Sequence, residues 1–406
     1  MKRMLIGNLV TPHRTIENGV VLVEDDKIVG VGTWEEFKNT SVDETLDFPG
    51  CYVSPGFIDI HVHGGGGSDT MDATVEALLN ITRTHAKGGT TGLYPTTLTA
   101  PFENILESLV ALRKAMDLNP SEETGAKILG AHVEGPYFNE SQVGAQNPKY
   151  LRKPSLDEAK ILLETGVVRR ISMAPELPGA LDVARFFSRH GVLVSIAHSN
   201  ATYQEVLMAI ENGFSHVTHV FSGMSSVRRI NSYRIAGVLE STLLLDELTT
   251  EMIADGHHLP PSLMRLVIKT KKPDRVCGIT DAISATGFGP GNYTLGGLNV
   301  VVERDVIEDF EISPEGCVAK LSNRQAFAGS VALMIDIVRN LVFYAGLTIT
   351  EAVKMVTNVP ARIMNIHAHR GTLSQGKFAD ITIFDQNFQV ILTMVEGKIV
   401  YHRNSR

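Results

Sequence analysis

The sequence predicts an α/β protein in which residues 56–370 form a (β/α)8 barrel and residues 1–55 and 371–406 form one small β-sandwich domain. Eight short apolar segments of β type alternate with helical segments in the middle of the chain, as in a barrel of parallel strands. Both ends instead alternate apolar and polar residues, the pattern of half-buried antiparallel strands.

The terminal domain is predicted from two β-rich stretches. Residues 1–55 contain MLIGNLV and GVVLVEDDKIVGVG, with turns expected at DD and GT. Residues 371–403 have the same alternation. Because both stretches differ from the middle of the chain, we expect them to pair with each other.

The barrel is predicted from strand and helix signals in order. The expected strands are 57–63, 90–96, 128–135, 169–176, 192–199, 215–221, 250–257 and 275–282. Helical segments such as 72–88, 155–166 and 202–213 lie between them, and several end in glycine, a frequent helix terminator. An open doubly wound sheet is the alternative, but no glycine-rich phosphate-binding pattern follows the first strand.

Composition excludes several classes of protein. The formal net charge of −8 over 406 residues gives no basic surface for nucleic acid. We see no secretory signal and no apolar run long enough to span a membrane. Cys51, Cys277 and Cys317 have neither zinc-ribbon spacing nor an even number for disulfides. We therefore expect a cytoplasmic protein that binds neither nucleic acid nor membrane.

Polar residues recur where the predicted strands end. They are His61 and His63 on the first strand, Glu134 on the third, His198 on the fifth, His219 on the sixth, Asp255 on the seventh and Asp281 on the eighth. The carboxyl ends of barrel strands meet at one mouth, where active sites lie. Residues far apart in the sequence are therefore expected to meet there.

Imidazole and carboxylate ligands suit a divalent metal such as zinc, iron or manganese. His61 and His63 share a strand face and could ligate one ion, His198 and His219 a second, and Glu134 could bridge the two. A metal ion lowers the pKa of water toward neutrality, and Asp281 is placed to exchange a proton with that water. One or two ions are expected.

Other histidines and the glycine run have simpler interpretations. An HxH pair alone is weak support for a metal site. His85 and His190 are expected at the surface or as helix caps, and His132 and His216 in structural roles. The remaining histidines lie in terminal or connecting segments: His13, His367, His369 and His402. Four glycines at 64–67 are expected to let the backbone pass close to metal or substrate.

Six motifs occur in a telling order: PGFIDIHVHGGGG, HVEGPYFN, IAHSNATY, VTHVF, ADGHH and TDAISATG. Together they resemble the amidohydrolase superfamily and, within it, the N-acetylglucosamine-6-phosphate deacetylase family, over nearly the whole chain. The resemblance implies hydrolysis of an acetamide to acetate and an amino-sugar phosphate by a homodimer. It also implies that Glu134, His198 and His219 are metal ligands, that His61 and His63 hold an optional second ion, and that Asp281 carries the proton.

The chain departs from this family around the substrate. Gln146 stands where the family has a histidine that helps to polarise the acetyl carbonyl, and Ser222 and Gly223 replace an asparagine and an alanine. His258 matches the family's DGxH motif, and Ala328 and Gly329 lie in FAGS, which matches LAGS. The resemblance implies that these residues contact the substrate.

The phosphate contact is left open among Arg228, Arg229 and Arg234, in a segment that could also be a solvated loop. The resemblance implies that one of these arginines reaches the phosphate across a dimer interface. N-acetylgalactosamine-6-phosphate and a non-phosphorylated N-acyl amine remain alternative substrates. A non-catalytic scaffold is a third hypothesis, against which the intact metal motifs argue.

Overall fold

Eight parallel strands form the centre of the computed structural model, which describes residues 1–118, 120–305 and 310–403. They are β5 (Phe57–Val62), β8 (Thr90–Pro95), β10 (Ala131–Glu134), β11 (Val168–Met173), β12 (Leu193–Ile196), β13 (Phe214–Val217), β16 (Thr249–Ile253) and β17 (Val276–Ile279). Each coincides with a predicted strand. Residues 119 and 306–309 of the predicted barrel and 404–406 of the predicted terminal domain lie outside the described residues.

The strands close into a barrel. Six of them pair in the order β10-β11-β12-β13-β16-β17, and β5 pairs with β8, which also pairs with the short β9 (Lys127–Ile128). Two parallel bridges join these sheets, Val62 with Ala282 on one side and Thr96 with His132 on the other. The (β/α)8 prediction is confirmed, and the open sheet is excluded.

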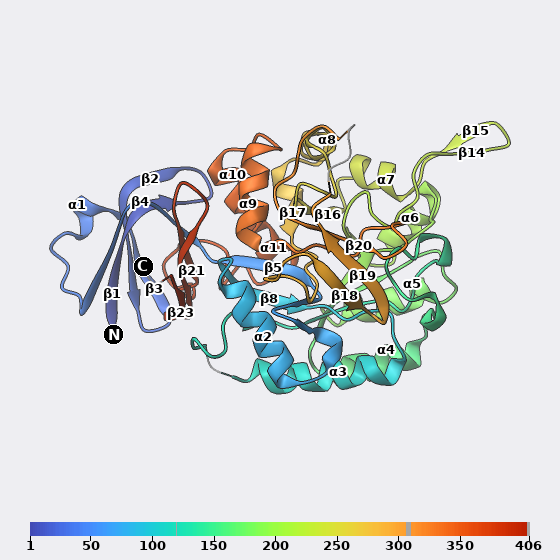
Figure 1. Ribbon diagram of the computed structural model, residues 1–406, viewed down its shortest axis with the longest axis horizontal. Coiled ribbons are helices and arrows are strands. Elements are labelled where there is room, and N and C mark those ends of the chain that lie inside the picture. The colour runs from blue at the N-terminus through green and yellow to red at the C-terminus, as the bar shows by residue number, and fades with distance from the viewer. Residues whose placement is uncertain (119, 306–309, 404–406) are drawn as a thin grey trace.

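Helices surround the strands in sequence order (Figure 1). They are α2 (Val75–Ala86), α3 (Phe102–Met116), α4 (Leu156–Glu164), α5 (Ala180–Arg189), α6 (Tyr203–Glu211), α7 (Val238–Leu244), α8 (Pro261–Lys271), α9 (Met334–Phe343), α10 (Ile349–Met355) and α11 (Asn358–Ile363). Thr74, Ser155 and Thr202 cap the three predicted helices by accepting backbone N–H groups. Sequence signals thus fix where these helices begin.

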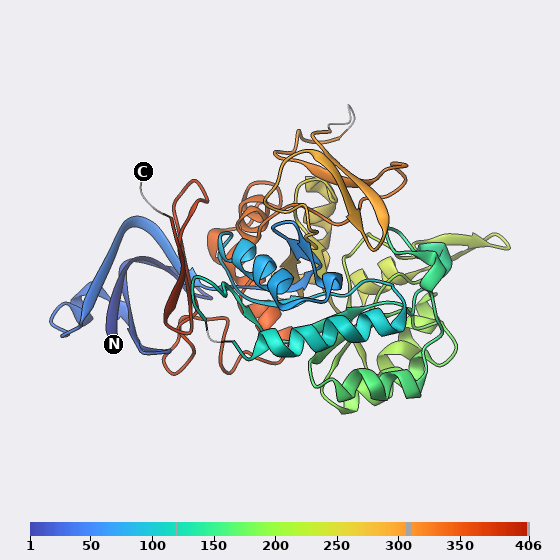
Figure 2. The same cartoon turned by 60° about the horizontal axis from the view of Figure 1, so that its bottom comes forward.

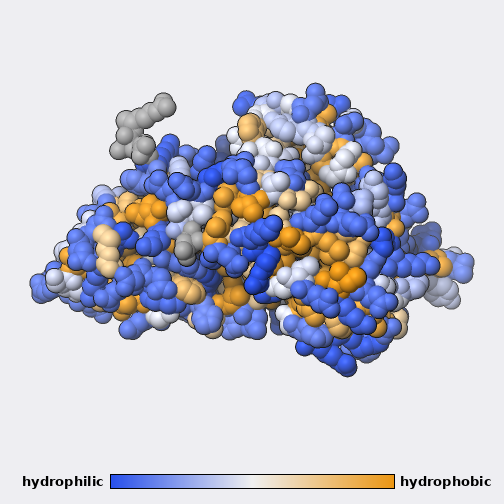
Figure 3. Space-filling view, turned by 90° about the horizontal axis from the view of Figure 1, so that it is seen from below, coloured by the Kyte–Doolittle hydropathy of each residue, from blue (hydrophilic) through white to orange (hydrophobic). Residues whose placement is uncertain are grey.

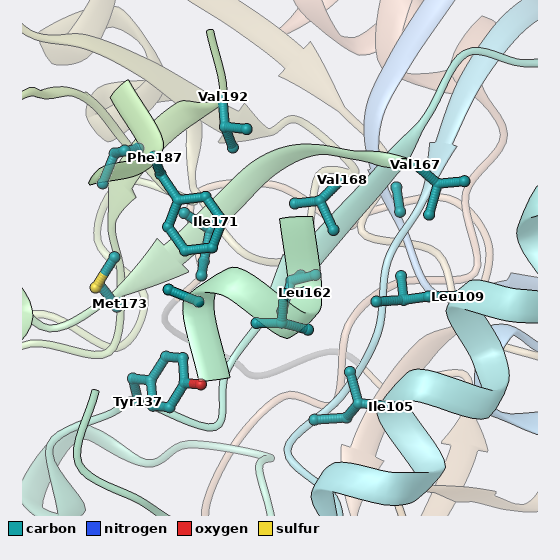
Figure 4. Close-up of a cluster of buried hydrophobic side chains, with 14 of the residues drawn as sticks. Ile105, Leu109, Tyr137, Leu162, Val167, Val168, Ile171, Met173, Phe187 and Val192 are labelled. Carbon is teal, nitrogen blue, oxygen red and sulfur yellow. The ribbon is translucent and has the colours of Figure 1, made fainter. Parts of the chain in front are cut away.

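The barrel core lies between helices and strands. Ile105 and Leu109 of α3, Leu162 of α4 and Phe187 of α5 pack with Ile171 of β11 in one buried cluster (Figure 4). Burying such side chains contributes about 1.5–3 kcal/mol each. This packing holds the strand ends, and the side chains on them, in place.

The two termini form one sheet beside the barrel, with the N-terminal strands blue and the C-terminal strands red (Figures 1 and 2). Its strands are β1 (Lys2–Val10), β2 (Thr15–Glu24), β3 (Lys27–Thr33), β4 (Glu44–Pro55), β21 (Ile381–Phe384), β22 (Val390–Val395) and β23 (Lys398–His402). Among the described residues they pair continuously, in the order β23-β22-β21-β4-β1-β2-β3.

This arrangement corrects the predicted sandwich in one respect: its strands belong to a single sheet whose two halves share a core. Leu5 and Val21 from the N-terminal half pack with Ile381 and Leu392 from the C-terminal half. The pairing of β1 with β4 is parallel, whereas alternation in the sequence had indicated antiparallel pairs throughout. The domain boundaries at 55/56 and 370/371 stay predictions.

Two small β-structures were not predicted. A three-stranded antiparallel sheet, β18 (Gly291–Leu295), β19 (Leu298–Glu303) and β20 (Val318–Leu321), follows the last barrel strand. A hairpin, β14 (Arg228–Ile230) with β15 (Tyr233–Ile235), projects from the body of the molecule (Figures 1 and 2). Shorter elements are α1 (Trp34–Phe37), β6 (Gly64–Gly65), β7 (Ser68–Asp69) and 3-10 turns at Thr70–Asp72, Glu140–Gln142, Pro148–Tyr150 and Pro273–Arg275.

The outer surface mixes apolar and polar side chains. Seen from below, hydrophobic patches are separated by hydrophilic residues (Figure 3). In the part of the chain that the structure describes, none of the helices has both the length and the apolar character needed to cross a membrane.

Candidate active site

A cavity opens at the carboxyl ends of the barrel strands. Its polar lining comes from His63, Glu134, Gln146, His198, His219, Ser222, His258 and Asp281. Leu98, Ile253, Leu295 and Phe327 supply apolar wall, and His61 lies fully buried next to these ligands. The predicted convergence is therefore present for residues at the ends of five strands, whereas Asp255 of the seventh does not line the cavity and instead contacts His258.

Three of these residues sit at sharp turns of the backbone. His198, His219 and Asp281 have φ values of 44°, 28° and 50°, a left-handed region that is unfavourable for residues other than glycine. Such strain persists where the surrounding structure imposes it, often at functional sites. It also ends β12, β13 and β17 three or more residues before the predicted limits, because the chain leaves the strand direction.

Glu134 lies at the centre of the site. Its Oε1 is 3.2 Å from His219 Nε2, 3.4 Å from His61 Nε2 and 3.6 Å from His198 Nε2. Its Oε2 is 3.3 Å from His63 Nε2. One carboxylate thus touches all four imidazoles.

The other ring nitrogen of each histidine is held by an acceptor. The Nδ1 atoms lie 3.2 Å from Glu251 Oε2 for His61, 3.2 Å from the Thr96 carbonyl for His63, 2.8 Å from the Gln142 carbonyl for His198 and 3.1 Å from the Ser222 carbonyl for His219. Carbonyl and carboxylate oxygens only accept, so each Nδ1 carries the proton. Nε2 is therefore the ring nitrogen that remains to bind a metal ion at the centre, the arrangement that metal-ligating histidines adopt.

The carboxylates around His61 and His63 favour positive charge at these two residues. Burial lowers the pKa of His61, but Glu134, Asp281 and Glu251 outweigh it and hold that pKa well above its usual value. Burial likewise opposes the carboxylates Asp281 and Glu134 around His63, which raise its pKa to about 9. His61 Nε2 and His63 Nε2 are only 3.3 Å apart, so two protonated rings would repel each other there, and a metal ion bound by both nitrogens would replace their protons.

The carboxylates respond in the opposite direction. Burial opposes the ionisation of Glu134 and Asp281, yet the neighbouring histidines, His61 foremost, lower both pKa values, that of Glu134 strongly. Both groups are therefore ionised at neutral pH. A buried pair of carboxylates surrounded by imidazole Nε2 atoms fits a divalent metal ion.

Two groups of ligand atoms are close enough for metal ions. His61, His63 and Glu134 form one, and Glu134, His198 and His219 form the other, with ligand atoms within 4.8 Å of one another in each. Asp281 Oδ1 lies 3.4 Å from His61 Nε2 and 3.3 Å from His63 Nε2, so it could also ligate an ion of the first group.

A third group in the described chain, His216, Glu251 and Cys277, differs from these two. Glu251 forms a buried ion pair with Arg170. The guanidinium already supplies the positive charge there, so this group does not fit a metal ion.

The side chain of Gln146 faces Glu134. Its Nε2 donates to Glu134 Oε2 at 2.8 Å and its Oε1 accepts from the Thr99 backbone N–H at 2.8 Å. A direct contact with substrate was expected here, and Gln146 does line the cavity. Its main hydrogen bonds, however, hold a candidate metal ligand.

Gly223 and Gly329 allow close approach in the site. Gly223 has a φ of 56°, and an added Cβ would lie 2.7 Å from His198 Nδ1. Gly329 has a φ of 63°, and an added Cβ would lie 2.5 Å from the Asp281 carbonyl. Both line the cavity, as does Ser222. Ala328 is instead buried in an apolar cluster and does not line the cavity, so its substrate contact stays a prediction.

His258 enters the cavity with its ring fixed by Asp255. Its Nδ1 lies 2.8 Å from Asp255 Oδ2, and the same aspartate accepts the backbone N–H groups of His257 and His258. Burial lowers the pKa of His258, but Asp255 outweighs this effect and raises it. Asp255 therefore orients His258, while His258 faces the cavity.

The candidate phosphate-binding arginines lie on the projecting hairpin. Arg228 donates to the carbonyl and the side chain of Asn200, at 3.2 and 2.8 Å, while Arg229 and Arg234 are exposed. None of these three arginines lines the cavity of its own chain.

The surface position expected for His85 was wrong. His85 is fully buried, and its Nε2 donates to the Gly64 carbonyl at 2.9 Å. Gly64 of the glycine run packs against neighbouring backbone: a Cβ there would lie 2.6 Å from Ser284 N, and residues 64–67 do not line the cavity. Small size at 64 serves packing between loops.

Arg170 and Glu251 were missed by sequence reasoning. Both are fully buried in barrel strands, and both lie within runs predicted as strands. A charged residue inside an otherwise apolar strand was the available signal, because such residues are rarely buried unless paired.

Comparisons with known proteins agree with this geometry. The sequence model of the amidohydrolase family matches residues 52–400. The chain is 33% identical to N-acetylglucosamine-6-phosphate deacetylase of Vibrio furnissii, over 86% of this chain and 83% of that protein. It is 32% identical to N-acetylgalactosamine-6-phosphate deacetylase of Escherichia coli O157:H7, over 86% and 87% of the two chains.

A solved structure is similar over the whole fold. It is a mutant N-acetyl-D-glucosamine-6-phosphate deacetylase of Mycobacterium smegmatis in complex with N-acetyl-D-glucosamine-6-phosphate. The TM-score is 0.85 at 29% identity, over 98% of this chain and 99% of that one.

Proposed function

The chain belongs to the amidohydrolase family, and we propose that it removes the acetyl group from an N-acetyl amino-sugar phosphate. N-acetylglucosamine-6-phosphate is the first candidate, with acetate and glucosamine-6-phosphate as products. The names of its relatives and the ligand in the similar structure support this substrate. Family membership makes the protein a hydrolase of amide C–N bonds.

One observation carries the proposal: four imidazoles with anchored Nδ1 atoms direct their Nε2 atoms toward Glu134, beside Asp281. In the proposal, Glu134, His198 and His219 hold one divalent ion. His61 and His63, with Glu134 and Asp281, hold a second. Zinc, iron and manganese all accept such ligands. When bound, an ion of this kind polarises a carbonyl group and makes water more acidic.

The residues of the chain have separate tasks in the proposed reaction. Asp281 accepts a proton from the water that adds to the acetyl carbonyl carbon. It then delivers that proton to the nitrogen as the C–N bond breaks, so that acetate and a free amine result. Its lowered pKa keeps it ionised and ready to accept. His258 is placed to donate a hydrogen bond to the sugar, and Leu295 and Phe327 keep solvent from one wall of the cavity.

Among the described residues, no arginine or lysine lines the cavity of one chain to bind the sugar phosphate. We propose a homodimer in which the β14–β15 hairpin of one copy brings Arg228, Arg229 or Arg234 to the cavity of the other. Val227 just before this hairpin is 53% exposed, and Ile230 and Tyr233 on it are 46% and 76% exposed. Apolar side chains on a projecting element favour contact with a second chain.

We also propose a cytoplasmic location. Cys51, Cys277 and Cys317 are all free of disulfides in the structure, which suits a reducing compartment.

N-acetylgalactosamine-6-phosphate is the second candidate substrate. The Escherichia coli relative bears that name, and the departures at Gln146, Ser222 and Gly223 lie at the cavity. A change of sugar with retention of the reaction is consistent with intact ligands beside altered neighbours.

One experiment tests the proposal. Acetate release is measured with metal-free protein and with protein loaded with Zn²⁺, Fe²⁺ or Mn²⁺. The four substrates are N-acetylglucosamine-6-phosphate, its galacto isomer and the two unphosphorylated sugars. We expect metal-dependent turnover of a phosphorylated sugar, at least tenfold better than that of its unphosphorylated partner. If only unphosphorylated sugars are hydrolysed, the proposed substrate class is wrong. If none of the four substrates is hydrolysed, the proposed deacetylase activity is wrong.

A further inference from the structure

A buried polar layer underlies the candidate metal centre and has no part in the proposed chemistry so far. It consists of Arg170 on β11, Ser195 on β12, Thr218 after β13 and Glu251 on β16. All four are fully buried. Removing a charge pair from water is costly, and such pairs often contribute little net stability. The buried pair of Arg170 and Glu251 is therefore not explained by stability alone.

Arg170 ties the layer to several strands at once. Its guanidinium donates to Glu251 Oε1, to the Ile60 carbonyl on β5 at 3.1 Å, to Ser195 Oγ at 3.1 Å and to Thr218 Oγ1 at 2.9 Å. These contacts fix the position of the guanidinium and, through it, one oxygen of Glu251.

The other oxygen of Glu251 faces the metal centre. Glu251 Oε2 accepts from His61 Nδ1 at 3.2 Å and from the backbone N–H of His219 at 3.1 Å. His61 belongs to one candidate ligand group and His219 to the other. A single oxygen thus holds a ligand from each, and at His219 it holds the backbone in its left-handed conformation.

We propose that Glu251, held by Arg170, is a positioning residue for the metal centre, an inference that rests on the proposed function. Its carboxylate fixes the ring and tautomer of His61, so that Nε2 faces the ion, and places the turn from which His219 extends. Partners of this kind around a metal site change metal affinity by roughly 10–100-fold when removed. A purely structural ion pair would instead be replaceable by apolar side chains of similar volume.

The test compares metal binding with folding stability. Metal-free wild-type protein, Glu251→Gln, Glu251→Met and the double variant Arg170→Met/Glu251→Met are titrated with Zn²⁺ against a chromophoric chelator, and their Co²⁺ absorption spectra are recorded. His61→Ala identifies the ion that His61 contacts. The control is Asp380→Asn, which breaks the nearly buried Arg370–Asp380 pair of the terminal sheet without touching the barrel mouth.

We expect Glu251→Gln to bind the ion near His61 roughly 10–100-fold more weakly, with an altered Co²⁺ spectrum. A glutamine has one oxygen where Glu251 uses two, so at least one contact is lost. The double variant should recover melting temperature relative to Glu251→Met yet keep the weakened binding. Asp380→Asn should melt earlier with wild-type affinity.

Wild-type affinity and spectrum in Glu251→Gln, or in the double variant if the single variants do not fold, would overturn the inference. The inference would also be overturned if the wild-type protein binds metal and His61→Ala binds the same number of ions. A wild-type protein that binds neither Zn²⁺ nor Co²⁺ contradicts the proposed function itself.

Discussion

Gln146 donates a hydrogen bond from its side-chain Nε2 to Glu134 Oε2, over 2.8 Å. Because the Thr99 backbone N–H fixes the other end of the amide, the orientation of Gln146 is set by the protein. A residue expected at the substrate thus also controls the central carboxylate of the site. Unlike a histidine, it cannot gain charge.

Replacing Gln146 by leucine should therefore weaken the site, because Glu134 loses a donor. We expect metal affinity to fall by about tenfold, the lower range for partners of metal ligands. Gln146→His should add an inflection near pH 6.5 to the profile of kcat/KM, since an imidazole titrates there. Chelator competition and pH–rate profiles measure these effects, and a profile identical to that of the wild type would contradict the second.

Asp281→Asn should lower kcat by roughly 10²–10⁴-fold, the usual contribution of a general acid–base group. The ion held by Glu134, His198 and His219 should remain, because the Asp281 side chain forms its ion pairs with His61 and His63. Turnover and elemental analysis check both points. Asp157→Asn, whose side chain is 93% exposed on α4, serves as the control; loss of all metal from Asp281→Asn would show that its role is misassigned.

Removing His61 and removing His198 should have different consequences. His61→Ala should lose one ion per chain and keep the other, whereas His198→Ala should lose the ion proposed to bind Glu134, His198 and His219 and with it activity. Metal-to-protein ratios after dialysis distinguish these results. His190→Ala, at an exposed helix end, should bind as the wild type does, and an unchanged ratio in His61→Ala would mean that β5 holds no ion.

The hairpin predicts a link between assembly and phosphate recognition. Alanine at Arg228, Arg229 or Arg234 should raise KM for the phosphorylated sugar by about 10–100-fold at the residue that binds phosphate, since a charged hydrogen bond contributes about 1.5–3 kcal/mol. Tyr233→Asp should give monomers with the same rise in KM, measured by light scattering and kinetics. A monomeric protein with wild-type KM would refute the shared site.

Burial of His85 predicts a pH dependence of stability. Burial lowers its pKa from 6.5 to about 4, so the unfolded chain binds a proton between these values while the folded chain does not. The free energy of unfolding is therefore unaffected by His85 above pH 6.5 and decreases as the pH falls toward 4, by roughly 3 kcal/mol at most. The denaturation midpoint of His85→Gln, which can still donate to Gly64, should depend less on pH over this range than that of the wild type. An equal pH dependence in both proteins would contradict the assignment.

The barrel was predictable because parallel strands are buried on both faces and read as apolar runs. Strand ends were predicted too late at His198, His219 and Asp281, because a left-handed backbone leaves no mark in hydrophobic periodicity. The β18–β19 hairpin did have a signal: Gly296 and Gly297, both with positive φ, stand between two alternating runs, a combination typical of tight hairpins.

The metal-ligand candidates could be named from the sequence, but their partners could not. Motif spacing found Glu134 and His219, whereas the contacts of Gln146 and Glu251 depend on loops and strands that meet only in the fold. His85 shows the same limit: its helix was predicted, yet the loop covering it, at Gly64, was not.

The terminal sheet has a consequence for synthesis. β4 pairs with β1 on one side and with β21 on the other, but the ribosome makes the two partners at opposite ends of the chain. The edge of β4 stays unpaired until Ile381 and the residues after it emerge. An unpaired strand edge is a template for association with other chains, so the nascent protein is most exposed to aggregation while its barrel is being completed.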